Sequence, residues 1–290
     1  MGGGSWTRES FVSYSKMTNK KVKSDGTLDF AGASAQQVYQ QRRLAPELNP
    51  KDVIRECCDS AEHPNTIPVI LALDVTGSMG DAALKVAGEL NTIMTTLYES
   101  VKDVEFMIMG IGDFAYDDAP LQVSQFESDI RIAEQLDKVF FEMGGGGNGW
   151  ESYTSAWAFA IKQTNLDCWK RNKKGVIITM GDEPFNPYIP CERYQEVTGH
   201  GPDFEMGRDI ESDKLYEQVK ELYDVYHINV NHRPRPVDIS GFKNMIGEDH
   251  VFDVPVNGVP EVIAQIVKDR EANNTSVNTV TPAPTRGISW

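Results

Sequence analysis

The sequence IPVILALDVTGSM, residues 67–79, decides the fold. Its first part, Ile67 to Leu73, is a continuous apolar run of strand length, which is typical of a strand buried on both faces. A short polar turn follows, and apolar residues then recur at helical spacing from about Gly80 to Ser100, which predicts an amphipathic helix. A buried strand that runs directly into a polar turn and a helix indicates an α/β protein.

The same alternation continues along the chain. Further strands are predicted at 104–111, 121–126, 175–180, 226–230 and 251–254, and further helices at about 129–143, 151–164, 211–224 and 259–270. This order predicts a doubly wound, mostly parallel sheet with helices on both faces, and the polar alternation at 121–126 favours an edge strand. The stretch from Gly181 to Asp209 contains four prolines and is predicted to be a long loop.

The charge of the chain is concentrated in its middle. The formal net charge is −15 over 290 residues, but residues 1–66 carry 9 basic and 8 acidic side chains, whereas residues 67–270 carry 18 basic and 34 acidic ones. An acidic protein repels polyanions, so we expect it to bind neither nucleic acid nor anionic membrane. Bound cations would relieve part of the repulsion within the middle block, although a solvated acidic surface accounts for most of it.

Three parts are expected from this pattern: an N-terminal arm at 1–65, a folded domain at 66–270 and a flexible tail at 271–290. The basic segment at 40–55 precedes the acidic domain. We expect the arm to pack on the domain, and this segment to lie across the sheet as a strap that pairs with acidic side chains. The alternative is a free arm that recruits a partner.

The sequence offers little evidence for export or membrane insertion. No stretch has the roughly 18 apolar residues of a membrane-spanning helix, and the first residues lack the apolar core of a secretory signal. The four cysteines, Cys57, Cys58, Cys168 and Cys191, show neither a disulfide framework nor a zinc-site spacing. A cytoplasmic location is therefore expected.

The polar turn after the first strand is the strongest candidate for a site. In an open α/β sheet, ligands bind outside the carboxyl ends of the strands. Asp74, Thr76 and Ser78 alternate along this turn, so their oxygens can point toward one place. A carboxylate with two hydroxyls suits Mg²⁺ or another hard divalent cation. The alternative is a plain strand-to-helix turn in which Ser78 or Asp81 caps the helix.

The run ALDVTGSMG resembles the metal-ion-dependent adhesion site (MIDAS) of von Willebrand factor A-type (vWA) domains, which carry Asp-x-Ser/Thr-x-Ser after their first strand. The resemblance extends over about residues 66–270 in the order of elements. It implies a Rossmann-like doubly wound fold with one antiparallel edge strand. It also implies that Asp74, Thr76 and Ser78 hold a divalent cation, to which a partner protein adds an acidic side chain.

The resemblance extends to two later loops. Asp182 follows the strand at 175–180 and matches the aspartate of the family's third metal loop. The second loop departs from the family's usual threonine: here a glycine-rich stretch leads to Glu151, which resembles the second loop of some intracellular members, with Thr154 as the alternative. Three carboxylates would already neutralise a 2+ ion, so the affinity for a partner's carboxylate is expected to be lower than in integrin-like adhesion.

The Asp-x-Thr-Gly-Ser motif is also similar to the phosphoryl-acceptor loop of haloacid-dehalogenase-type phosphotransferases. Asp74 would then be the nucleophile that attacks phosphorus. That chemistry calls for a second acidic residue at the position of Thr76 and another aspartate where Asn186 stands. A metal-dependent phosphohydrolase or phosphotransferase is therefore the alternative function, and a non-catalytic module is the main prediction.

The predicted function is metal-dependent protein–protein interaction inside a larger intracellular assembly. By analogy with the family, the partner is expected to be an AAA+ ATPase or another multi-subunit machine. Aromatic residues of the 181–209 loop are expected to serve as anchors beside the metal, or else to pack on their own domain; they are Phe185, Tyr188, Tyr194 and Phe204.

Overall fold

The computed structural model describes residues 4–23, 28–29, 39–142, 148–199 and 208–277. The glycine run at 144–147 and Phe204 lie outside the described residues. The central sheet contains β2 (Ile67–Asp74), β3 (Val104–Ile111), β4 (Leu121–Val123), β6 (Gly175–Gly181), β9 (Tyr223–Val230) and β10 (Val251–Val254). The apolar runs that the sequence indicates therefore form the strands of one sheet.

The strand order makes this sheet doubly wound. Neighbouring strands follow the order β10-β9-β6-β2-β3-β4, and β4 alone in this sheet runs antiparallel, against β3. Numbered along the chain, the order is 3-2-1-4-5-6, which reverses direction between β2 and β6. The predicted fold class, including the antiparallel edge strand, is confirmed. The place where ligands bind in such sheets is the crevice outside the carboxyl ends of β2 and β6.

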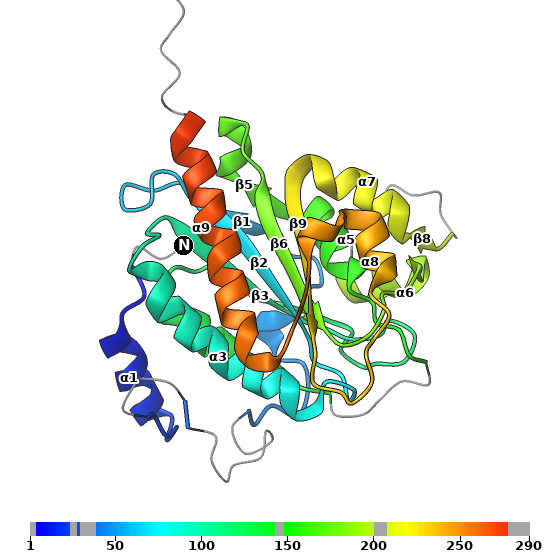
Figure 1. The fold of residues 1–290 in the computed structure, drawn as a ribbon, viewed down its shortest axis with the longest axis horizontal. Helices are drawn as coiled ribbons and strands as arrows, with labels where there is room; N and C mark the ends of the chain where they lie inside the picture. The colour runs from blue at the N-terminus through cyan, green and yellow to red at the C-terminus, as the bar shows by residue number, and fades with distance from the viewer. Residues whose placement is uncertain (1–3, 24–27, 30–38, 143–147, 200–207, 278–290) are drawn as a thin grey trace, which may run out of the picture.

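Helices cover both faces of the sheet (Figure 1). They are α1 (Arg8–Met17), α3 (Gly80–Tyr98), α4 (Arg131–Leu136), α5 (Thr154–Lys162), α6 (Cys191–Thr198), α7 (Ser212–Leu222), α8 (Ser240–Ile246) and α9 (Val259–Val277). Every residue of β2 is buried, and its side chains alternate between two cores. Val69 and Leu71 face α3 and α9, whereas Ile70 and Ala72 face α5 and α7.

One helix is shorter than the sequence predicts because a side-chain contact replaces part of it. The helix predicted at 129–143 is only α4, since the edge-strand residue Gln122 replaces its next turn: the Gln122 amide bonds to both the N–H and the carbonyl of Phe140, at 2.9 and 2.7 Å. At the other end, α9 continues to Val277, past the boundary expected at 270.

The stretch predicted as a long loop after Gly181 is more regular than expected. It contains α6 and a short antiparallel pair, β7 (Tyr188–Ile189) with β8 (Ile210–Glu211). Helix α6 begins after Pro190, a residue that suits a helix start, and ends at Gly199 with φ of +73°, a left-handed conformation that glycine adopts readily. Pro187 and Pro190 therefore lie at the two ends of β7 rather than within a continuous loop.

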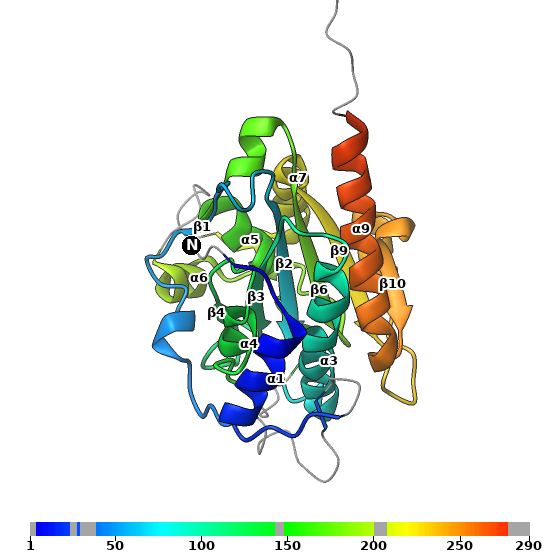
Figure 2. The same ribbon diagram turned by 90° about the vertical axis from the view of Figure 1, so that its left-hand side faces the viewer.

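The N-terminal segment packs beside α3 and α4 (Figure 2). Thr7 and Ser10 form a capping box that starts α1 in this segment. Trp6 is buried, stacks on Phe11 and donates a hydrogen bond from Nε1 to the Thr95 hydroxyl at 3.0 Å. Buried aromatic side chains thus form part of this contact.

The rest of the segment passes around the β4 edge to the other face of the sheet. There β1 (Arg55–Cys57) pairs in parallel with β5 (Thr164–Leu166), and Arg55 donates to the backbone carbonyl of Val123 at 2.9 Å. The charge pairs with the domain have both polarities: they include Lys20 with Asp137, Asp59 with Arg171 and Glu47 with Lys138. Arg42 and Arg43 are exposed. The basic strap expected across the sheet is therefore wrong: the segment passes around the edge of the sheet and contributes both basic and acidic side chains to the ion pairs.

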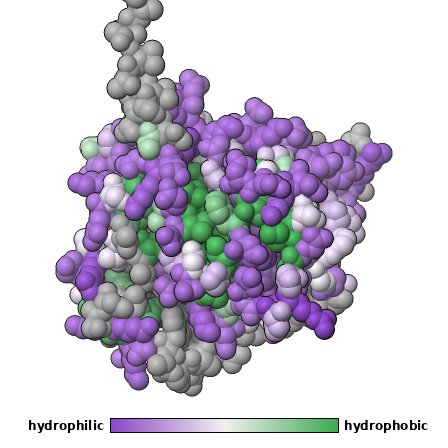
Figure 3. Space-filling view, in the orientation of Figure 1, coloured by the Kyte–Doolittle hydropathy of each residue, from purple (hydrophilic) through white to green (hydrophobic). Residues whose placement is uncertain are grey.

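The molecular surface reflects the high charge. In the view of Figure 3, hydrophilic residues cover most of this face, and the hydrophobic residues in view gather near its middle, over the central sheet. Among the described residues, no helix combines the length and apolar character that crossing a bilayer requires.

Candidate metal centre

The first site loop is folded by its own side chains. Asp74 is the last residue of β2, and its Oδ1 accepts hydrogen bonds from both the backbone N–H and the hydroxyl of Thr76, at 2.9 and 2.7 Å. Such local bonding by aspartate and threonine favours a tight turn over a continued strand. The Thr76 hydroxyl in turn lies 3.1 Å from that of Ser78, just before α3. The three alternating oxygens of the motif therefore do converge.

The third loop adds a carboxylate from the neighbouring strand. Asp182 follows β6, the strand on the other side of the reversal point, and its side chain is 1% exposed. The Ser78 hydroxyl donates to Asp182 Oδ1 at 2.9 Å. The pairing of β2 with β6 thus brings together residues 104 positions apart in the sequence.

The second loop places Glu151 near Asp74 and directs Thr154 elsewhere. The backbone of Glu151 is held against the third loop by bonds to Pro184 and Asn186, at 2.9 and 2.8 Å. Its Oε2 is buried and has no hydrogen-bond partner among the described residues. Thr154 instead shares a hydrogen bond with Ser212 at 3.1 Å. The structure therefore leaves an unpaired carboxylate oxygen at the site, and buried groups of this kind are rare in folded proteins.

Burial makes the cluster electrostatically costly without a cation. The pKa of Asp74 rises from 3.8 to about 7 because the carboxylate is fully buried, although hydrogen bonds from Thr76 and Tyr153 oppose the shift. Burial, followed by the negative charge of Asp74, also raises the pKa of Glu151. A divalent cation among these oxygens would favour their ionised forms.

The spacing of the oxygens fits a hard cation. In an octahedral Mg²⁺ shell with bonds of about 2.0–2.1 Å, adjacent ligand oxygens are about 3 Å apart. The successive contacts Asp74–Thr76, Thr76–Ser78 and Ser78–Asp182 measure 2.7, 3.1 and 2.9 Å. Among the described residues, no three acidic, histidine or cysteine side chains form a metal-binding group by themselves. The oxygens that contact one another belong to carboxylates and hydroxyls, and such a donor set would suit Mg²⁺ better than zinc.

Tyr153, which the motif did not reveal, supports the site from behind. Its hydroxyl donates to Asp74 Oδ2 at 2.7 Å and accepts a long bond of 3.4 Å from the backbone N–H of Glu183. A side chain at Gly181 would meet this hydroxyl, because a Cβ there would lie 1.9 Å from it. The glycine that ends β6 therefore makes room for the tyrosine that orients Asp74.

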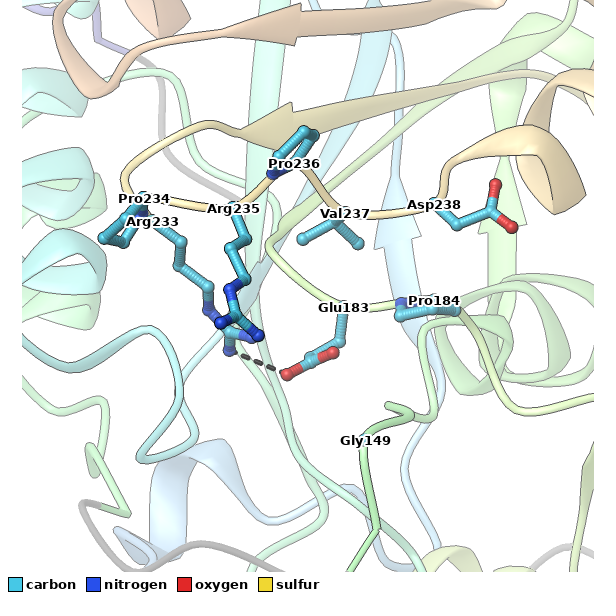
Figure 4. A pocket seen from close by; sticks show the side chains of 9 residues that line it. All are labelled: Gly149, Glu183, Pro184, Arg233, Pro234, Arg235, Pro236, Val237 and Asp238. Carbon is cyan, nitrogen blue, oxygen red and sulfur yellow. Dashed lines mark ion pairs between the residues drawn. The ribbon is translucent and has the colours of Figure 1, made fainter.

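Two basic residues also reach the site, from the loop after β9. His232 Nε2 and Arg233 Nε lie 2.8 and 2.5 Å from Asp182 Oδ2, and a terminal nitrogen of Arg233 lies 2.7 Å from Glu183 (Figure 4). Because β9 is parallel to β6 and adjacent to it, its carboxyl end meets the same edge of the sheet. Basic residues directly after a predicted neighbouring strand were the sequence feature that could have identified them.

The acidic turn after β3 is largely occupied by its own backbone. Asp117 Oδ2 accepts the N–H of Asp113 at 2.6 Å, and Asp113 accepts the N–H of Ala115 at 2.8 Å and the Asn148 amide at 2.7 Å. Both aspartates add to the negative potential that raises the pKa of Glu151. They therefore shape the field of the site and stabilise the turn beside it.

The aromatic anchors expected beside the metal mostly pack inward. Tyr194 is fully buried and stacks on Phe114, and Phe185 packs edge-on against Phe242 with ring centroids 4.8 Å apart. Tyr188 is 48% exposed. Tyr194 and Phe185 therefore pack within the domain instead of forming the expected interface. They belong to the core on the α5 and α7 side of the sheet.

The geometry offers little for a nucleophilic role of Asp74. A carboxylate that attacks phosphorus needs an oxygen that the substrate can reach. Asp74 is 0% exposed, and both of its oxygens accept hydrogen bonds, from Thr76 and Tyr153. Asn186, at the position where the phosphotransferase pattern has an aspartate, donates its amide to Ser152 at 3.2 Å. In this arrangement neither oxygen of Asp74 is open to a substrate phosphorus.

Comparisons with known proteins bear on the fold. No protein-family profile matches the chain, and no curated protein matches its sequence. Similar solved structures include the pilus adhesin SpaC from Lactobacillus rhamnosus GG in its open conformation, with 12% identity, a TM-score of 0.49 and coverage of 77% of this chain. The chain spans 31% of that adhesin.

Two further structures cover their own chains almost completely. One is the vWF domain of the type V pili tip protein Mfa5 from Porphyromonas gingivalis, at 11% identity and a TM-score of 0.43, with 76% of this chain and 98% of that chain covered. The other is the conserved hypothetical protein BatB from Bacteroides thetaiotaomicron, at 14% identity and a TM-score of 0.42. The match covers 71% of this chain and 99% of that chain. All three scores are below 0.5, so the fold class rests on the strand order itself.

Proposed function

We propose that this chain is a vWA-like module that binds another protein through a divalent cation, Mg²⁺ by preference. Asp74, Thr76, Ser78 and Asp182 would hold the ion, with Glu151 as the third carboxylate. The observation that carries the proposal is the continuous set of oxygens, 2.7–3.1 Å apart, at the carboxyl ends of the two central strands. Glu151 supports it, because its Oε2 is buried without a partner among the described residues and Asp74 and Thr76 are near enough to influence its pKa.

The partner would complete the metal shell with an acidic side chain. Ser78 is the most accessible of the oxygen donors, so the open side of the ion would lie there. Three carboxylates weaken the attraction of the ion for a fourth. However, Arg233 pairs with Asp182 and returns positive charge to the site. We therefore expect a partner carboxylate to bind with modest affinity, as suits reversible assembly.

The setting we propose is a multi-subunit assembly in the cytoplasm, with an AAA+ ATPase as one candidate partner. Cys57, Cys58, Cys168 and Cys191 are all free thiols, and three of them are buried, which is compatible with a reducing compartment. A pull-down from the native host with the wild type and Asp74→Ala tests this. A partner retained equally by both proteins would contradict a metal-dependent contact.

Metal binding is tested by isothermal titration of Mg²⁺ into the metal-free protein. We expect one site in the wild type and loss of binding in Asp74→Ala and Ser78→Ala. Asp118→Asn is the matched control, because Asp118 is an exposed carboxylate in the turn after β3. An Asp74→Ala isotherm equal to the wild-type one would contradict the site. A phosphatase substrate panel tests the alternative: turnover lost in Asp74→Asn but kept in Ser78→Ala would favour a phosphohydrolase.

A further inference from the structure

A pocket lies beside the metal loops, between the Glu183–Pro184 turn and the loop after β9 (Figure 4). Its volume is about 510 Å³, within the range of sites that hold small ligands or a few side chains. Arg233, Pro234, Arg235, Pro236 and Val237 form one wall. No motif in the sequence had indicated this pocket.

The loop that forms this wall is fixed at both ends. The N–H of Asn231 bonds to the carbonyl of Val254 at 2.8 Å, and Asp238 accepts the N–H of Ser240 at 2.9 Å. Between these points, prolines flank Arg235 on both sides, and their rings restrict the backbone. A side chain presented by such a loop loses little conformational freedom when a ligand binds.

The charges of the pocket leave one arginine without a partner. Glu183 is paired with Arg233, and Asp238 is committed to the start of α8 through Ser240. Arg235 is exposed and makes no ion pair or hydrogen bond within the described part of the chain. In Figure 4, Arg233 and Arg235 both extend toward the side of the pocket where Glu183 lies. The two arginines of the lining are balanced by Glu183 and Asp238, so the feature that favours an anionic group is the unpaired guanidinium of Arg235.

We propose that this pocket binds a short acidic segment of a partner protein, with a carboxylate on Arg235 and apolar contacts on Pro234, Pro236 and Val237. A net charge of −15 disfavours a polyanion such as nucleic acid, whereas a few carboxylates aimed at one positive site are accepted. The inference deepens the proposed function, because it rests on the chain acting by binding a protein. Arg233 joins the two places, since it contacts Asp182 of the metal loops and lines the pocket.

The test is fluorescence anisotropy with the full chain and a labelled eight-residue peptide that has two glutamates among leucines and alanines, measured in Mg²⁺ and in EDTA. We expect saturable binding that Arg235→Glu weakens roughly tenfold or more in both buffers, with a smaller loss for Arg235→Lys. Arg43→Glu is the matched control: it makes the same charge change at an exposed arginine of the N-terminal segment. The same peptide with glutamine in place of both glutamates should not bind.

The outcomes separate the pocket from the metal site. If Arg235→Glu and Arg43→Glu weaken binding equally, the attraction is non-specific and the pocket proposal is wrong. If Asp74→Ala abolishes binding and Arg235→Glu leaves it unchanged, the metal proposal stands and the pocket proposal fails. If Arg235→Glu alone weakens binding and EDTA has no effect, the pocket stands and metal dependence fails. Displacement of the peptide by inorganic phosphate at lower concentration than by free glutamate would overturn the carboxylate assignment.

Discussion

Removal of the Tyr153 hydroxyl tests how the site is supported. In the wild type, this hydroxyl donates to Asp74 Oδ2 at 2.7 Å, and both residues are 0% exposed. Tyr153→Phe keeps the ring and its packing but leaves one oxygen of a buried carboxylate without its donor. A hydrogen bond to a charged buried group contributes about 1.5–3 kcal/mol to the free energy of unfolding. A chain of 290 residues should then lose about 2–5 °C in Tm.

The same change should weaken Mg²⁺ binding. Residues that orient a metal ligand typically alter affinity by about 10–100-fold when they are replaced. The hydrogen bond from Tyr153 also lowers the pKa of Asp74, so its loss raises that pKa further and makes Mg²⁺ binding more dependent on pH. Titration calorimetry at pH 6, 7 and 8 measures both effects, and thermal unfolding in EDTA measures the change in stability.

Tyr39→Phe is the matched control for this experiment. Tyr39 is also a buried tyrosine, at 3% exposure, but its hydroxyl has no hydrogen-bond partner among the described residues. Its removal should therefore leave both Tm and Mg²⁺ affinity nearly unchanged. A Tyr153→Phe protein with lower Tm but wild-type Mg²⁺ affinity at every pH would refute the claim that Tyr153 positions Asp74 for the metal.

Three further outcomes are expected. The folded-state pKa of Asp74 is raised to about 7 from 3.8, so the metal-free protein should lose stability as pH rises from about 4 to 7. Added Mg²⁺ should restore more stability at the higher pH, and urea unfolding measures both effects. Arg233→Gln should strengthen Mg²⁺ binding about fivefold by removing the cation that competes for Asp182; weaker binding in calorimetry would contradict this competition. Trp6→Ala should lower the free energy of unfolding by about 3 kcal/mol, whereas a free arm would show no change in urea.

Much of the fold could be predicted because its strands are buried on both faces. Continuous apolar runs such as those of β2 and β6 have few alternative structures inside an α/β pattern, so their type and order were read correctly. The short α4 could not be predicted, because Gln122, a residue of another element, satisfies the backbone of Phe140. The α1 capping box was present in the sequence, but its stability depends on the burial of Trp6.

The residues of the candidate site likewise fall into those that the sequence predicts and those that tertiary packing decides. Asp74, Thr76 and Ser78 lie close together in the sequence, and their local hydrogen bonds alone bring their oxygens together. Asp182 was predictable because it follows a strand, and parallel strands align their carboxyl ends. Whether Glu151 or Thr154 faced the cluster depended on how the second loop packs against Pro184 and Asn186, which no local pattern encodes.

The sequence by itself therefore determined the class of the fold and the chemistry of the first loop, because both depend on local periodicity and spacing. The tertiary structure decided what surrounds that loop. Tyr153, His232 and Arg233 come from separate elements and meet Asp74 and Asp182 only after the sheet has formed. Their placement follows from strand pairing and side-chain packing over long sequence separations. Through these contacts Tyr153 holds Asp74, His232 and Arg233 pair with Asp182, and Arg233 lines the neighbouring pocket.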